Sequence, residues 1–298
     1  LTPAVYAATR AAKVEPLPYL FACAFIANAA SFVLPISNPA NLVVFGEQMP
    51  PLLEWLRYFA LPSVAAIAAT FVVLRISQRD CLRGSIDSVS DQAVMLAPMA
   101  AVAAVGIGAT AVVLLASSAL GMDLGLPTFV CGVAVAAIVL LVTRQAPTAI
   151  ARDISWSVLP LVAGLFILVE GLNRTGVLPA LAEQLKQAAA LSPHATAWEA
   201  GIITAFASNL VNNLPMGLIA ATTTQAAQSS LHVIGAVLIG VDLGPNLSVT
   251  GSLATILWLI ALRREGEHVG ALCFLKLGIL VMPPALILSL LALALTAP

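Results

Sequence analysis

Charged side chains are scarce in this chain. Asp, Glu, Lys and Arg make up 9% of the 298 residues, hydrophobic residues make up 60%, and the mean hydropathy is +1.02. A soluble domain carries about 25% charged residues, so this composition excludes an ordinary water-soluble fold. The net charge of −1, without a basic tail or patch, gives no sign of nucleic-acid binding. We therefore predict an all-α integral membrane protein whose apolar segments are solvated by lipid.

The patterns of metal sites and of membrane proteases are also missing. The four cysteines lie far apart, with no Cys-x-x-Cys pair and no histidine at metal-ligand spacing, so we interpret them as small apolar residues in helices. Neither the Gly-x-Gly-Asp order of aspartyl membrane proteases nor a Gly-x-Ser-Gly motif occurs. We predict no metal, no cofactor and no enzyme activity. Leu1 does not begin a signal peptide, and we expect further residues ahead of it.

Apolar segments long enough to cross a hydrocarbon layer recur along the chain. A layer of about 30 Å needs roughly 20 helical residues. The segment 174–191 is instead amphipathic and suits the membrane interface. The predicted elements are a hairpin arm at 1–9, a broken helix at 17–46, spans at 52–76, 93–118, 127–142 and 156–171, an interfacial helix at 174–191, a re-entrant hairpin at 197–228, a broken helix at 231–262 and a span at 270–296.

The positive charges favour the hairpin at 197–228. If that segment enters and leaves on one side, the loops 10–16, 75–91, 143–155 and 263–268 all face the same side. These loops hold nine of the thirteen Lys and Arg residues, as expected for cytoplasmic loops. We predict that the hairpin opens to the outside.

A broken helix followed by a clean span occurs twice, first within 17–76 and again within 231–296. The break motifs are similar, with PANLVVFG at 39–46 and PNLSVTG at 245–251. The predicted topology orients the two broken helices oppositely, which is typical of an inverted-repeat secondary transporter with discontinuous helices. We predict that 1–76 ends the first repeat and that 77–298 forms the second. The tip of the first hairpin would then precede Leu1.

Short polar side chains gather at the three predicted breaks. Non-helical backbone in lipid leaves polar groups unpaired at a cost of several kcal/mol, so such breaks usually line a cavity. Neutral amides and hydroxyls, without Arg or Lys, suit a small uncharged solute rich in hydroxyl groups. The predicted substrate-binding residues are Ser37, Asn38, Asn41, Ser208, Asn209, Asn212, Asn213, Asn246, Ser248 and Thr250.

Asp242 is the one carboxylate placed directly at a predicted break, among Ile, Gly, Val and Leu. A carboxylate inside a membrane is costly and usually functional, so we predict an ion- or proton-coupling role. The alternative is a structural hydrogen-bond acceptor. Asn28 and Ser31 are interpreted as interhelical hydrogen-bonding residues.

Three segments resemble the ArsB arsenite/antimonite efflux permease family of the ion-transporter superfamily. They are LIGVDLGPNLSVTGSLATILWLIALRREG at 238–266, SNLVNNLPMGL at 208–218 and SFVLPISNPANLV at 31–43. The LTP at 1–3 resembles the residues after the first hairpin motif of that family. The likeness runs through nearly the whole chain in segment order.

The resemblance implies proton-coupled efflux of trivalent arsenic and antimony hydroxides across the inner (plasma) membrane by alternating access. It implies arsenite or antimonite, protons and the lipid bilayer as partners, and it leaves open a soluble ATPase subunit and a homodimer. The alternative is a sodium- or proton-coupled carboxylate or cation transporter of the same superfamily, although carboxylate carriers would be expected to show Ser-Asn-Thr motifs. Thiolates hold arsenic(III) tightly, and no cysteine lies in a break motif, so we predict cysteine-independent transport.

Overall fold

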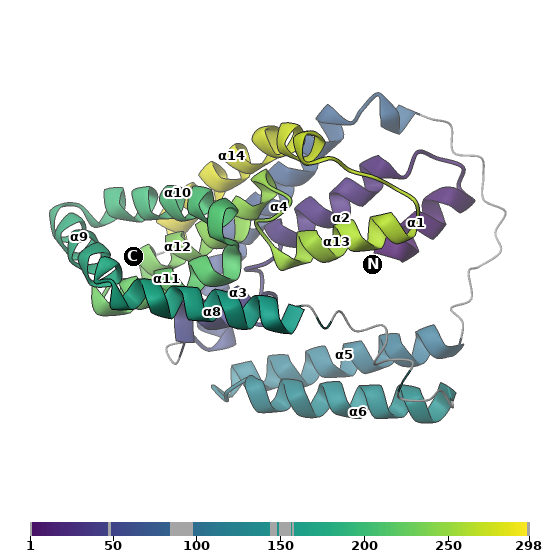
Figure 1. The fold of residues 1–298 in the computed structure, drawn as a ribbon, viewed down its shortest axis with the longest axis horizontal. Helices are drawn as coiled ribbons and strands as arrows, with labels where there is room; N and C mark the ends of the chain where they lie inside the picture. Colours follow the sequence, from purple (N-terminus) through teal and green to yellow (C-terminus); the bar gives the residue numbers. More distant parts are fainter. Residues whose placement is uncertain are drawn as a thin grey trace. The chain divides into compact units, whose positions relative to one another are not determined.

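The computed structural model describes residues 2–46, 49–83, 98–143, 148, 156 and 158–296, and every secondary structure element within them is a helix (Figure 1). The predicted all-α class is therefore confirmed. Residues 93–97 and 157 of the predicted spans, residues 84–91 of the loop 75–91, and most of the loop 143–155 lie outside the described residues. The elements are α1 (Thr2–Ala11), α2 (Leu17–Ala29), α3 (Pro39–Phe45), α4 (Leu52–Ser77), η2 (Cys81–Arg83), α5 (Pro98–Ala119), α6 (Gly125–Thr143), α8 (Val158–Arg174), α9 (Val177–Leu191), α10 (Pro193–Val211), α11 (Asn213–Ala226), α12 (Leu231–Leu243), η3 (Gly244–Leu247), α13 (Leu253–Arg264) and α14 (Ala271–Thr296).

Four helices within the described ranges are long and apolar enough to cross a membrane: α4, most of α5, nearly all of α6, and α14. Their outer faces carry large apolar side chains, and Val64, Phe71, Leu141 and Leu295 are between 56% and 81% exposed. Water would disfavour so much apolar surface, whereas lipid tails solvate it. The helices thus agree with an integral membrane protein.

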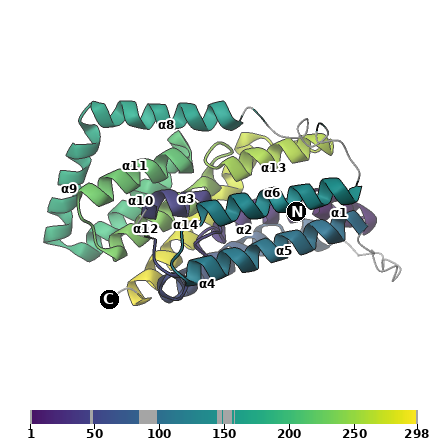
Figure 2. The ribbon, with the colours of Figure 1, turned by 90° about the horizontal axis from the view of Figure 1, so that it is seen from below.

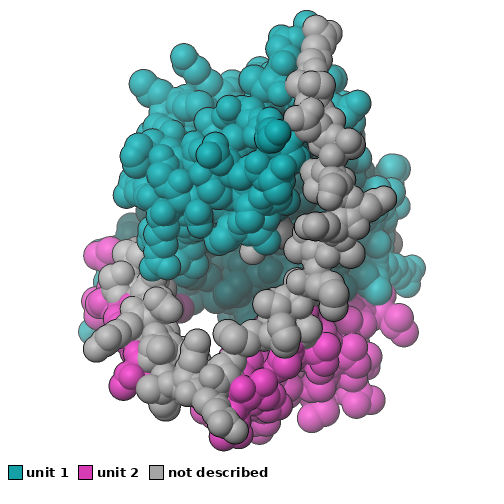
Figure 3. Space-filling view, turned by 90° about the vertical axis from the view of Figure 1, so that its right-hand side faces the viewer, with its two compact units in different colours: residues 1–49, 55–90, 169–298 teal, residues 50–54, 91–168 magenta. Residues whose placement is uncertain are grey.

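The chain forms two compact units, coloured separately in Figure 3. One comprises residues 1–49, 55–90 and 169–298, and the other comprises 50–54 and 91–168. In the second unit α5 packs along α6. The first unit contains all the predicted polar breaks, so the candidate site belongs to it alone.

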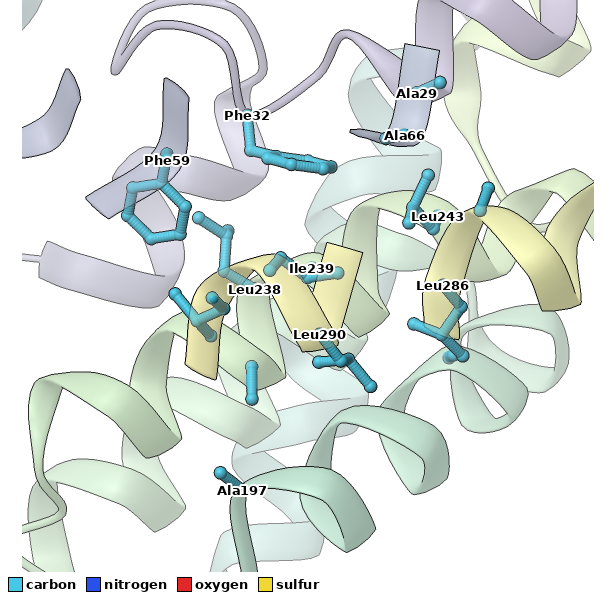
Figure 4. Close-up of a cluster of buried hydrophobic side chains, with 14 of the residues drawn as sticks. Ala29, Phe32, Phe59, Ala66, Ala197, Leu238, Ile239, Leu243, Leu286 and Leu290 are labelled. Atoms are coloured by element: carbon cyan, nitrogen blue, oxygen red, sulfur yellow. The ribbon is translucent and has the colours of Figure 1, made fainter. Parts of the chain in front are cut away.

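Helix α12 forms the centre of the first unit. Its Leu238, Ile239 and Leu243 are fully buried, and Figure 4 shows them among side chains from α4, α10 and α14. The neighbouring α10 approaches so closely that a Cβ atom on Gly240 would overlap the carbonyl oxygen of Gly201. A small residue at such a contact lets two helix backbones touch, which is the usual means of tight packing in lipid.

The polar segments interrupt the helices at three places. Residues 30–38 separate α2 from α3, Asn212 separates α10 from α11, and η3 with residues 248–252 separates α12 from α13. These interruptions fall in the segments where breaks were expected. The opposite orientation of the two repeats stays a prediction.

The two broken helices share one spacing. Leu17 and Leu231 begin α2 and α12, Ala29 and Leu243 end them, and each helix has 13 residues. Asn38 caps α3 as Ser252 caps α13, so each of these landmarks recurs after 214 residues. The motif pairing of PANLVVFG with PNLSVTG does not match equivalent positions, because Pro39 is the first residue of α3 whereas Pro245 is the second residue of η3, the segment that follows α12.

Candidate functional site

A cavity of about 280 Å³ lies where the three breaks meet in the first unit. Its wall comes from the end of α2, the break after it, and the starts of α11 and α13. None of the described residues that line it carries a charge. The polar lining residues are Asn28, Ser31, Ser37, Asn38, Asn213 and Ser252.

The tip of the hairpin is bonded to the second break. The backbone N–H of Asn213 donates to the carbonyl oxygen of Gly251 at 2.8 Å, and Asn212 Nδ2 donates to the carbonyl oxygen of Thr250 at 2.8 Å. Asn212 has φ of +75°, a region that asparagine enters more readily than most residues. The turn between α10 and α11 is therefore held against the segment before α13.

Two side-chain hydrogen bonds join the first break to the second. Asn38 Nδ2 donates to Asp242 Oδ1 at 2.8 Å, and Asn28 Nδ2 donates to Asn246 Oδ1 at 2.9 Å. Asp242 is 1% exposed, and its Oδ2 has no hydrogen-bond partner among the described residues. The three breaks thus form one connected polar group around the cavity, and α3 lies beside α11 and α12 in both views (Figures 1 and 2).

Three half-helices begin at this group, each with a side-chain cap. Asn38 Oδ1 accepts from Ala40 N at 3.0 Å, Asn212 Oδ1 from Leu214 N at 3.3 Å, and Ser252 Oγ from Ala254 N at 3.0 Å. Each cap pairs one of the free N–H groups of the first helical turn. Asn38 has two roles, because its amide nitrogen bonds Asp242 while its oxygen caps α3.

The predicted site residues separate into two groups. Ser37, Asn38 and Asn213 line the cavity, and Asn212 and Asn246 bond the breaks to one another. The remaining predicted residues are placed elsewhere: Asn41 is buried with its amide bonded to the carbonyls of Ser31 and Leu34, Ser208 and Asn209 bond the carbonyl of Ala205 in their own helix, and the hydroxyls of Ser248 and Thr250 lie 3.5 Å apart in an exposed pair.

The cavity also includes residues that the sequence did not suggest. Asn28 and Ser31 were interpreted as interhelical contacts, and Ser252 was not singled out. The signal for Ser252 is a serine directly before the apolar helical run LATILWL, which is a common helix start. No comparable signal marks Asn28, because its partner Asn246 lies 218 residues away.

Comparison of the sequence with known proteins identifies the family of this chain. A family model described as "Citrate transporter" matches residues 1–241. The arsenical pump membrane proteins of Escherichia coli (strain K12) and Yersinia enterocolitica are each 30% identical to this chain over 311 residues, covering 99% of it and 71% of their own length. The chain belongs to the arsenical pump membrane protein family. As a member of this family it is a multi-pass cell-membrane transporter rather than an enzyme.

Proposed function

We propose that this chain exports trivalent arsenic and antimony as neutral hydroxides, in exchange for protons, through the cavity at the three breaks. The names of its relatives support an arsenical solute, since arsenical pump membrane proteins match 99% of the chain. The observation that carries the proposal is the uncharged polar lining of the 280 Å³ cavity.

The lining has the donors and acceptors that a hydroxide needs. Amide and hydroxyl side chains offer both N–H or O–H donors and oxygen acceptors. The Oδ1 of Asn213 is buried without a hydrogen-bond partner in the described part of the chain and can accept from a solute hydroxyl. None of the four cysteines lines the cavity, so the solute is held by reversible hydrogen bonds rather than by sulfur.

Citrate is the second candidate, because the matching family model is described by that substrate. A tricarboxylate carries several negative charges near neutral pH, and proteins usually bind such groups with Arg or Lys. No Arg or Lys is present among the described residues that line the cavity. The lining therefore favours the neutral hydroxide.

Asp242 is the residue we assign to proton coupling. It is the only Asp, Glu, Lys or Arg among the buried side chains of the described residues, and its carboxyl has one hydrogen-bond donor, Asn38. A buried charge without a cation is costly, so loss or gain of a proton here changes the stability of the whole group of breaks. The unpaired Oδ2 is the atom on which the proton would be carried.

The test uses everted membrane vesicles, in which efflux is measured as uptake. The D242N variant is expected to lose arsenite uptake driven by a pH gradient while retaining downhill exchange. The exposed loop substitution D123N is the matched control and should behave as wild type. Gradient-driven uptake by D242N at the wild-type rate would place coupling elsewhere. Gradient-driven uptake of citrate without arsenite uptake would favour the second candidate.

A further inference from the structure

The two broken helices put different residues at equivalent positions. Asn28 is the last residue but one of α2, and Asp242 is the last residue but one of α12. Both side chains are almost completely buried. The common spacing of 214 residues therefore pairs an amide in the first broken helix with a carboxyl in the second.

The hydrogen bonds of these two residues are crossed in the same way. Asn28 bonds Asn246 in the break of the second broken helix, and Asp242 bonds Asn38 in the break of the first. Each residue thus reaches from the end of its own helix to an asparagine of the opposite break. The two positions share their burial, their place in the helix and the type of their partner, and they differ in whether the side chain can ionise.

We propose that Asn28 is the neutral counterpart of Asp242 and that its amide limits how many protons the transporter carries in each cycle. This inference rests on the proposed function, in which Asp242 carries a proton. Asparagine has nearly the shape of aspartate but does not exchange a proton in this way. For each neutral hydroxide molecule that leaves, one proton enters on each carrying carboxyl, and no bond to arsenic changes.

Few charged or titratable groups lie on the elements that surround Asn28. Helices α1, α12 and α13 and the segment η3 pack against α2, and Phe274 of α14 stacks on its Phe25. The charged residues of these elements are Asp242 itself, Arg10 at the end of α1, Arg263 and Arg264 at the end of α13, and Lys276 in α14. His232, at the start of α12, is their one histidine. Position 28 also faces the cavity, so a carboxyl there would lie beside the solute.

The proton number can be read from the accumulation ratio of arsenite. For exchange of n protons with one neutral solute, this ratio at equilibrium changes about tenfold per proton for each unit of pH gradient. The logarithm of the ratio plotted against the gradient therefore has slope n. The measurement uses everted vesicles that contain the full-length protein, with the membrane potential clamped by potassium and valinomycin.

The N28D variant is expected to have a slope greater than wild type by about one, which is an additional tenfold accumulation per pH unit. The slope of D242N should be lower than that of wild type by about one, and the N28D/D242N double variant should return to the wild-type slope. The matched control is N173D, the same substitution at an exposed position of α8, which should leave the slope unchanged.

This inference would be overturned if the slope of N28D equals that of wild type and the slope of the double variant is no higher than that of D242N. The role of Asp242 would then stay intact. A wild-type slope in D242N would instead defeat the proposed coupling residue, and N28D alone would then decide: an increase supports the role of position 28, and no increase refutes it. If N28D does not accumulate in the membrane, the double variant is decisive, because it keeps the number of buried carboxyls constant.

Discussion

Replacing Asn41 with alanine is expected to destabilise the first break without removing any side chain that lines the cavity. Asn41 is 0% exposed, and its Nδ2 donates to the carbonyl oxygens of Ser31 at 2.9 Å and Leu34 at 3.1 Å, with Pro35 at 3.4 Å. It does not line the cavity. The side chain therefore holds the 30–38 segment in its non-helical course.

The expected cost follows from those bonds. Each buried hydrogen bond contributes about 1 kcal/mol net, and a buried acceptor left unpaired costs about 1–3 kcal/mol. The carbonyl of Leu34 keeps a second bond from the N–H of Ser37, so the carbonyl of Ser31 loses its main partner and the carbonyl of Pro35 loses a weaker bond. We expect N41A to lower the free energy of unfolding by about 2–3 kcal/mol.

The assay is reversible unfolding in mixed micelles, followed by circular dichroism, combined with arsenite transport by the folded protein. N41A should unfold more easily than wild type, while the KM for arsenite stays near the wild-type value. The control is N173A, an exposed substitution expected to change the unfolding free energy by less than about 0.5 kcal/mol. Wild-type stability with a strongly raised KM would refute the reasoning and make Asn41 a solute contact.

Three further predictions use other features. G278A should destabilise the protein by about 1–3 kcal/mol, because the added Cβ would overlap the carbonyl of Asn246, and a stability within error of wild type would contradict that contact. Single cysteines at the exposed positions Ala195 and Gln228 should both react with an impermeant reagent added outside intact cells, whereas labelling from opposite sides would exclude a re-entrant hairpin. Serine at all four cysteine positions should leave arsenite transport intact, since no cysteine lines the cavity; loss of transport in a correctly inserted variant would show a thiol requirement.

Composition and local pattern were enough to predict the helical class and the positions of the breaks. Lipid leaves no partner for exposed backbone, so polar and proline-rich interruptions of long apolar segments are a strong signal. The register of the two broken helices could not be predicted in this way. A proline serves at the first residue of α3 and again at the start of η3, and the matching letters therefore marked different structural positions.

The roles of the individual asparagines also depended on three-dimensional structure. Asn38 and Asn41 are three residues apart, yet one reaches Asp242 beside the cavity and the other bonds the backbone of the preceding segment. The direction in which a side chain points changes by about 100° for each residue of a helix, and the partner of Asn38 is 204 residues distant. Local sequence contains neither of these facts.

The bonds among the three breaks restrict the kind of movement that could expose the cavity first to one side of the membrane and then to the other. Asn213 is bonded to Gly251, Asn28 to Asn246 and Asn38 to Asp242, so separating the break after α12 from either of the other two would expose polar groups that lipid cannot satisfy. Packed contacts of this kind move together more easily than they stretch. We therefore expect the three breaks to move together as one rigid body, so that the cavity keeps its shape around the solute. The contacts between this body and the rest of the protein would change instead.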